Sequence, residues 1–264
     1  MRGRTIGLAV VMAVAVGLLA APADDARKKE NKSDPKNLCL NGDFEKGTDT
    51  PDGWQRVDGL TTFWVDDPDG KRGKIIKVDT DVLQSQGYDW WVKIARGARA
   101  KDAPRKLPTT PPKYDTLAGL DGVWFWSDFI PVEKGKAYWL TVDIKGEPDV
   151  MAWLVGYESK ESTAFGADAG AFQEFLKEKT AGKPKDNVRL FEGFINKYTW
   201  RGQLNARYAK PLENGWRRWT RDKLPFRPTK MTPKVRFVRV LLLPYWPPGV
   251  CYIDNVRLTE VEEK

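Results

Sequence analysis

The sequence predicts an all-β fold, an antiparallel β-sandwich. From residue 37 onward, short segments alternate apolar with polar residues, as half-buried strands do. Gly, Pro and Asp recur between these segments, which is typical of turns that join antiparallel strands. The chain also holds 12 tryptophans, and large aromatic side chains fill the cores of such sandwiches.

The strands follow from this alternation in chain order. In residues 137–146, for example, Tyr138, Leu140, Val142 and Ile144 fall on one face, which we expect to be buried. The expected strands cover 37–45, 61–65, 73–82, 122–132, 137–146, 150–158, 216–226, 234–245 and 250–261.

Two segments interrupt the strand pattern. Residues 95–119 are rich in Pro and basic residues and are expected to form a long surface loop. Residues 168–182 are predicted to be helical, with Asp168 as the N-cap and Gly182 and Pro184 as stop signals. Each segment is too short to bury a core alone, so we expect both to be insertions in one domain, residues 37–264.

The N-terminus predicts export. Residues 1–23 combine Arg2 and Arg4 with a long apolar run and small residues before a cleavage site after Ala23, which is the pattern of a signal peptide. An uncleaved anchor is the alternative. Residues 24–36 are almost entirely polar or charged and predict a disordered linker. We therefore expect a secreted or periplasmic monomer without a later membrane span.

Composition excludes several kinds of site. The chain has no histidine, which excludes Ser-His-Asp hydrolysis, histidine general bases and the usual zinc and copper sites. Only two cysteines are present, so a cysteine-rich metal cluster is also excluded. Export argues against a nucleic-acid partner, although the basic clusters 105–113 and 216–223 contain or adjoin aromatic residues as in some nucleic-acid sites.

Three segments carry a resemblance to a known family. "NLCLNGDFEKGTDTPDGW" (37–54), "SDFIPVEKGKAYWLTVDIKG" (127–146) and "VCYIDNVRLTEV" (250–261) resemble the opening, central hairpin and final strand of secreted carbohydrate-binding modules. These modules have a galactose-binding-like jelly roll and accompany cellulases and xylanases. The resemblance implies a jelly roll that binds a polysaccharide or glycan without catalysis. This chain is longer than such modules, because of its two insertions.

The opening segment offers oxygen ligands for a cation. Along a strand, Asn41, Asp43 and Glu45 would point to one side next to a glycine turn, and Ca²⁺ prefers carboxylate, amide and carbonyl oxygens. In the resembled modules a structural calcium joins the first and last strands, which implies Asp254 as a further ligand. Our predicted Ca²⁺ ligands are Asp43, Glu45 and Asp254. The alternative is that Asn41 and Asp43 cap a turn and Glu45 is solvated.

The two cysteines lie in the expected first and last strands. Cysteines of exported proteins are more often paired than free, so we expect a disulfide between Cys39 and Cys251. Two buried thiols are the alternative.

Glycan binding needs exposed aromatic rings beside polar side chains. Trp54, Trp139 and Trp153 lie in patterned segments and are assigned to the core, whereas other tryptophans lie in less regular, polar surroundings. The predicted carbohydrate-binding residues are Trp90, Trp91, Trp200, Trp246, Gln86, Asp89, Arg201 and Gln203.

The net charge and the spacing of acidic residues bear on the kind of glycan and on catalysis. Loss of Arg2 and Arg4 would lower the net charge from +8 to +6, which would favour an anionic glycan. The nearest match to a glycosidase Glu-x-Asp-x-x-Glu strand motif, at 147–152, lacks its third acid and contains a proline, so we predict no catalytic residue. The alternatives are a glycoside hydrolase or polysaccharide lyase with an unrecognised acid pair, and a purely structural exported domain.

Overall fold

A computed structural model describes residues 36–95, 97–160, 198–204, 206–221 and 224–261. These described residues belong to one compact unit. The predicted signal peptide, nearly all of the predicted linker and the predicted helix 168–182 lie outside the described residues. No helix in the described part of the chain is long and apolar enough to cross a membrane.

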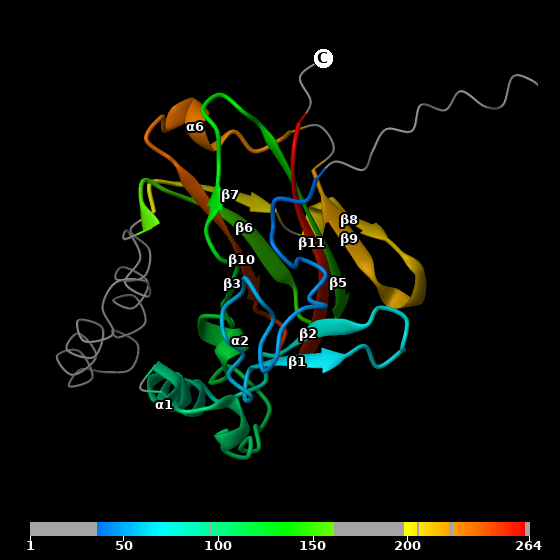
Figure 1. Cartoon of the computed structure of the whole chain (residues 1–264). Helices are drawn as coiled ribbons and strands as arrows, with labels where there is room; N and C mark the ends of the chain where they lie inside the picture. The colour runs from blue at the N-terminus through cyan, green and yellow to red at the C-terminus, as the bar shows by residue number, and fades with distance from the viewer. Residues whose placement is uncertain (1–35, 96, 161–197, 205, 222–223, 262–264) are drawn as a thin grey trace, which may run out of the picture. The chain divides into compact units, whose positions relative to one another are not determined.

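The described chain is an all-β sandwich of two antiparallel sheets (Figure 1). The first sheet has the strand order β1-β2-β11-β5-β9-β8, and the second has the order β3-β10-β6-β7, with β4 paired to β10. The strands are β1 Thr62–Asp66, β2 Lys74–Asp79, β3 Phe125–Trp126, β4 Ile130–Pro131, β5 Tyr138–Gly146, β6 Val150–Tyr157, β7 Trp200–Leu204, β8 Ala209–Pro211, β9 Arg217–Thr220, β10 Phe237–Pro244 and β11 Val250–Glu260. The predicted sandwich is thus confirmed, while the galactose-binding-like jelly roll stays a prediction.

The core lies between the two sheets. On β5 the predicted face is confirmed, because Tyr138, Leu140, Val142 and Ile144 are all at most 1% exposed. They belong to the same apolar cluster as inward residues of β6 and β10. Burial of apolar surface contributes about 25 cal/mol per Å². The inward-facing residues of the alternating strands therefore stabilise the fold.

The opening segment is a turn and not the expected strand. Asn41 and Phe44 adopt left-handed backbone conformations, with φ of 49° and 57°. The Asn41 side chain bonds Lys46 N, Lys46 O and Asp52 O, so it holds the loop together. This is the turn-capping role that an asparagine amide performs well.

Helices appear where the sequence pattern indicated none. The helix α1, Gln84–Ala95, follows β2, and its residue Trp90 reaches the core. Gly87 lowers helix propensity, but tertiary packing overrides it, since a side chain there would meet Leu117 at 2.8 Å. Within the predicted loop 95–119, the described residues include the end of α1, the short helix η1, Ala100–Asp102, and the first residues of α2, Leu117–Leu120. The remaining short helices are η3 Ala206–Tyr208, η4 Glu213–Gly215 and α6 Pro228–Met231.

Candidate functional site

Two exposed aromatic rings stack on each other at a surface formed by loops. Tyr114 is 63% exposed and Trp246 is 42% exposed. Their ring centroids are 5.4 Å apart and their planes differ by 9°. Tyr114 precedes α2, and Trp246 lies between β10 and β11, so the tertiary fold brings together residues 132 positions apart. We call this pair the aromatic platform.

The loop that carries Tyr114 is anchored by acids at the end of β2 and just after it. Lys113 Nζ lies 2.8 Å from Asp81 Oδ2, and Thr109 Oγ1 donates to Asp81 Oδ1 at 2.8 Å. Lys106 Nζ lies 2.7 Å from Asp79 Oδ2. Partial burial alone would raise the pKa of Asp81, but the bonds from Lys113 and Thr109 and the charge of Lys106 outweigh it, so the pKa lies below its ordinary value. The carboxylate is therefore ionised at neutral pH and fixes the loop.

The loop that carries Trp246 is fixed by main-chain bonds. Asp149 N donates to Trp246 O at 3.2 Å, and Tyr245 N donates to Asp149 O at 2.9 Å. Gly249 and Thr80 exchange further bonds, including Thr80 N to Gly249 O at 2.9 Å. Because the segment after β2 contacts both loops, the two rings of the platform share one support.

The other three predicted sugar-binding tryptophans are largely packed. Trp90 is 4% exposed and donates its Nε1–H to Asp58 O, so it has no ring face open to a ligand. Trp91 is half-buried and donates to Asp58 Oδ2. Trp200 packs on the core with its ring edge-on to Phe226. Trp90 and Trp91 were expected in irregular surface structure, and their place on α1 corrects that expectation.

The predicted polar partners lie in several places. Gln86 bonds Arg105 O and Leu107 N, so its amide supports the 103–116 loop. Asp89 is exposed on α1. Arg201 is exposed on β7 and stacks over Trp153 with 4.8 Å to the centroid, and Gln203 pairs opposite Trp153. The structure does not gather these four residues around Trp246.

Of the two rings, the sequence analysis named Trp246 as a candidate and did not name Tyr114. Tyr114 lies in the Pro-rich stretch "TTPPKYD", which has no strand or helix pattern that would relate it to another segment. Only tertiary placement reveals the pair.

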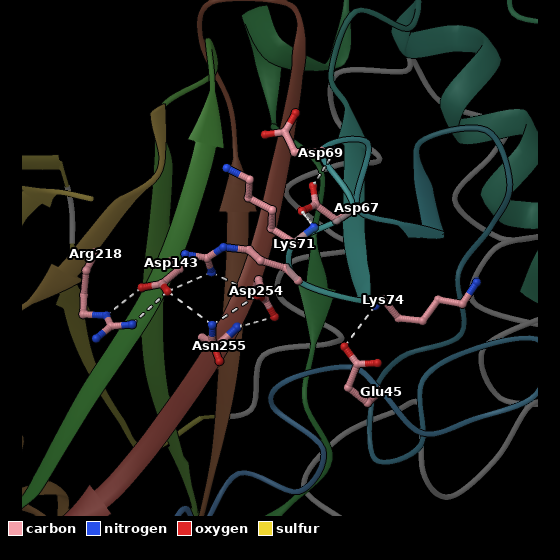
Figure 2. Close-up of polar contacts among 10 residues, drawn as sticks. Glu45, Asp67, Asp69, Lys71, Lys74, Asp143, Arg218, Asp254 and Asn255 are labelled. Atoms are coloured by element: carbon pink, nitrogen blue, oxygen red, sulfur yellow. Dashed lines mark hydrogen bonds and ion pairs between the residues drawn. The ribbon is translucent and has the colours of Figure 1, made fainter. Parts of the chain in front are cut away.

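A second polar cluster lies on the outer side of the first sheet, beneath the β1–β2 hairpin (Figure 2). Arg72 Nη1 lies 3.0 Å from Asp143 Oδ2 and 3.0 Å from Asp254 Oδ2. Arg218 binds Asp143 through two bonds of 2.7 and 2.9 Å, and this pairing raises the pKa of Arg218. The Arg72 guanidinium also lies 4.1 Å from the ring centroid of buried Trp216. We call these residues the arginine–aspartate network.

The predicted calcium ligands have other surroundings in this structure. Asp254 accepts bonds from Arg72 and Asn255, so a guanidinium already holds its carboxylate. Glu45 instead accepts the Lys74 N–H at 3.0 Å, and Asp43 is exposed on the turn. Among the described residues, no group of three or more Asp, Glu or Cys side chains is placed to hold a metal ion.

The same network contains two neighbouring carboxylates, the kind of group that glycoside hydrolysis uses. Because Asp143 Oδ2 and Asp254 Oδ2 each lie 3.0 Å from Arg72 Nη1, these two oxygens are at most about 6 Å apart. Their side chains, however, are 0% and 3% exposed and are neutralised by two arginines. A substrate therefore has no access to them in this structure.

The two cysteines are free, and the predicted disulfide is not formed. Leu38 N donates to Leu258 O and Val256 N donates to Gly42 O, which places Cys39 beside residues 256–258. Cys251 lies at the other end of β11, roughly 15–20 Å away by strand rise, whereas a disulfide needs Cα atoms within about 7 Å. Both thiols are buried, and burial raises the pKa of Cys39 to about 12.

Comparison with known proteins gives matches among solved structures, of which two are described here. No protein-family model matches the chain, and no curated protein matches it. The enzymatically active domain of tailspike protein 4 from bacteriophage CBA120 aligns with 85% of this chain at 12% identity and a TM-score of 0.43; the match spans 21% of the tailspike chain. A protein assigned as sugar-binding from Bacteroides thetaiotaomicron aligns over 86% of this chain and 100% of its own, at 13% identity and a TM-score of 0.35. These values are too low to assign the chain to the family of either protein.

Proposed function

We propose that this protein is an exported, non-catalytic glycan-binding module that holds its ligand at the aromatic platform. The observation that carries the proposal is the parallel stack of Tyr114 and Trp246, two large rings that remain exposed. Exposed aromatic surface costs free energy in water, so a rigid exposed pair is better explained by a ligand than by folding.

The chemistry of the platform suits a sugar ring. Pyranose rings present C–H groups on one face, and the electron-rich face of an aromatic ring attracts those slightly positive hydrogens. Exposed carboxylates lie close by in sequence or space: Asp115 follows Tyr114, and the Glu147 carboxylate lies beside Gly249. Carboxylate oxygens accept hydrogen bonds from sugar hydroxyls. Ring face and acceptors together provide the two contacts that a sugar needs.

Binding without catalysis is favoured over a hydrolase or lyase by the burial of Asp143 and Asp254. It is favoured over a purely structural domain by the exposure of the platform, since a structural domain would gain from covering both rings. The glycan class at the platform is a matter for experiment, and neutral and acidic polysaccharides should both be tried.

The test is an array of soluble neutral and acidic polysaccharides, read together with a reducing-sugar assay. We expect binding without product, and we expect Trp246→Ala and Tyr114→Ala each to weaken binding about tenfold, which corresponds to about 1.4 kcal/mol. Met231→Ala is the matched control, because Met231 is 83% exposed on α6. Product release would support the hydrolase or lyase, and binding that both variants retain would place the ligand elsewhere.

A further inference from the structure

A basic pocket lies at the edge of the first sheet, away from the aromatic platform. It has a volume of about 300 Å³ and lies where the edge strand β8 pairs with β9 (Figure 1). Its lining consists of Arg207, Tyr208, Ala209, Lys210, Thr220, Arg221 and Leu224. Three of these seven residues are basic and none is acidic.

Aromatic rings position the arginines of this pocket. The Arg207 guanidinium lies 4.7 Å from the Tyr208 ring centroid, and the Arg221 guanidinium lies 5.4 Å from the same ring. Arg221 also lies 5.1 Å from the centroid of the Phe226 ring. Ring contacts orient a guanidinium without neutralising it, whereas a carboxylate partner would neutralise it. Within the described part of the chain, neither Arg207 nor Arg221 forms an ion pair with an acid.

Arg221 also has a buried hydrogen-bond donor. Its Nε–H is buried and has no hydrogen-bond partner among the described residues. A buried donor without an acceptor costs about 1–3 kcal/mol, and such a donor calls for an explanation such as a missing ligand or water. An oxyanion in the pocket would provide acceptor atoms next to this guanidinium.

We infer that this pocket binds a sugar residue that carries an oxyanion, either a carboxylate or a sulfate ester. Arg207 and Arg221 supply the charge complement, and the Thr220 hydroxyl can bond a sugar hydroxyl. Leu224, 60% exposed, provides an apolar wall for the sugar ring. The inference rests on the proposed function for its ligand class, a glycan, but it uses none of the residues of the platform.

A nucleic acid fits this pocket less well. Phosphate-backbone binding requires a basic stripe along several phosphates, and single-stranded binding adds several aromatic rings in series. Here one concave pocket holds a single lining ring, Tyr208, which suits one charged sugar residue.

The experiment compares three soluble polymers at 150 mM salt: dextran, dextran sulfate and polygalacturonic acid. The variants are Arg207→Gln and Arg221→Gln, and Arg207→Lys keeps the charge. Lys134→Gln is the matched control, because Lys134 is an exposed lysine in the 133–136 turn and does not line the pocket. Circular dichroism confirms that each variant is folded before binding is measured.

We expect the native protein to bind the charged polymers. The pocket variants should leave any binding of dextran unchanged. Arg207→Gln should weaken binding of at least one charged polymer about tenfold, because it removes a charged hydrogen-bond donor to the oxyanion, and Arg207→Lys should restore part of the binding. A loss confined to dextran sulfate would identify the oxyanion as a sulfate ester, and a loss confined to polygalacturonic acid would identify it as a carboxylate. Equal losses in Arg207→Gln and Lys134→Gln would show general charge attraction and overturn the inference.

Two further outcomes separate the inference from the proposed function. If Trp246→Ala leaves all binding unchanged while Arg207→Gln abolishes binding of a charged polymer, the platform proposal fails and the pocket inference stands. If inorganic phosphate or duplex DNA competes as well as the charged polymer and shows the same loss with Arg207→Gln, the ligand is not a glycan and the inference is overturned.

Discussion

Arg72 is the residue on which the arginine–aspartate network depends. It places one cation between Asp143 and Asp254, two carboxylates that would repel each other on neighbouring strands. Burial nevertheless raises the pKa of Asp254 from an ordinary 3.8 to about 6, because its bonds from Arg72 and Asn255 compensate only part of the lost hydration. Asp254 therefore makes stability depend on pH.

The sign of this dependence follows from linkage. Between pH 4 and 6 the folded state binds more protons at Asp254 than the unfolded state does, so the free energy of unfolding falls as pH rises through this range. A shift of about 2 pKa units corresponds to a loss of up to about 3 kcal/mol. Asp254→Asn removes the titration, so the variant should gain stability relative to the native protein between pH 4 and 6.

Urea unfolding at pH 4, 5, 6 and 7 measures this difference. Asp115→Asn is the control, since Asp115 is exposed on a loop and lies outside the network. Parallel stability curves for the native protein and Asp254→Asn would contradict the expectation.

At the scale of elements, the N-terminal segment joins the last strand through Asn37. Its Nδ2 donates to Val256 O at 3.0 Å, and its Oδ1 accepts Leu258 N at 2.9 Å and Cys39 N at 3.0 Å. Gly42 continues the contact, because a Cβ there would lie 1.9 Å from Val256 O. The opening turn is thus held against β11 by hydrogen bonds of Asn37 and by the close approach of Gly42 to Val256.

Asn37→Ala should lower the free energy of unfolding by about 1–3 kcal/mol, because it leaves the buried Leu258 N–H without its acceptor. Asn37→Asp should cost less, since it keeps that acceptor and loses only the donor to Val256 O. Urea unfolding compares both with Leu40→Ala, a change at a residue that is 64% exposed. An effect of Asn37→Ala no larger than that of Leu40→Ala would show that the segment is not a structural tie.

The sequence predicted elements where local pattern and tertiary environment agree. Strands β5, β6, β10 and β11 were predictable because their alternation reflects burial on one face. Helix α1 was not, because Gly87 and neighbouring tryptophans give no clear helical pattern and packing decides its conformation. The opening strand was wrong for a related reason: left-handed Asn41 and Phe44 are set by local turn chemistry, which alternation does not reveal.

The candidate site was less predictable than the fold. Trp246 was named as a candidate because it lies in a less regular segment, but its partner Tyr114 comes from a loop whose position depends on Asp81 and Lys113. The basic cluster 216–223 contains Thr220 and Arg221 of the pocket, but its partner Arg207 was not named, since Arg207 and Arg221 converge only when η3, β8 and β9 come together. Sites built from distant loops leave no periodic signal in one sequence.

At the scale of the whole molecule, the platform and the pocket are separate. Thr220 of the pocket pairs with Thr141 on β5, whereas Trp246 contacts Asp149 beyond the end of that strand. The rise of β5 from Thr141 to Gly146 alone is about 16 Å. The two surfaces share no lining residue, and sites separated by more than about 10 Å usually act independently on stability and on short ligands.

This separation predicts how the two sites combine. For a short acidic oligosaccharide, the double variant Trp246→Ala/Arg207→Gln should show a coupling energy within about 0.5 kcal/mol of zero, because one short ligand contacts only one site. A long acidic polysaccharide can reach both sites, and the second contact then becomes intramolecular. Each single variant should therefore weaken the long polymer by a larger factor than the short one. Calorimetry measures the binding free energies of the short and the long ligand for the native protein and the three variants. A strong coupling energy with the short oligosaccharide would mean that the platform and the pocket form one continuous site.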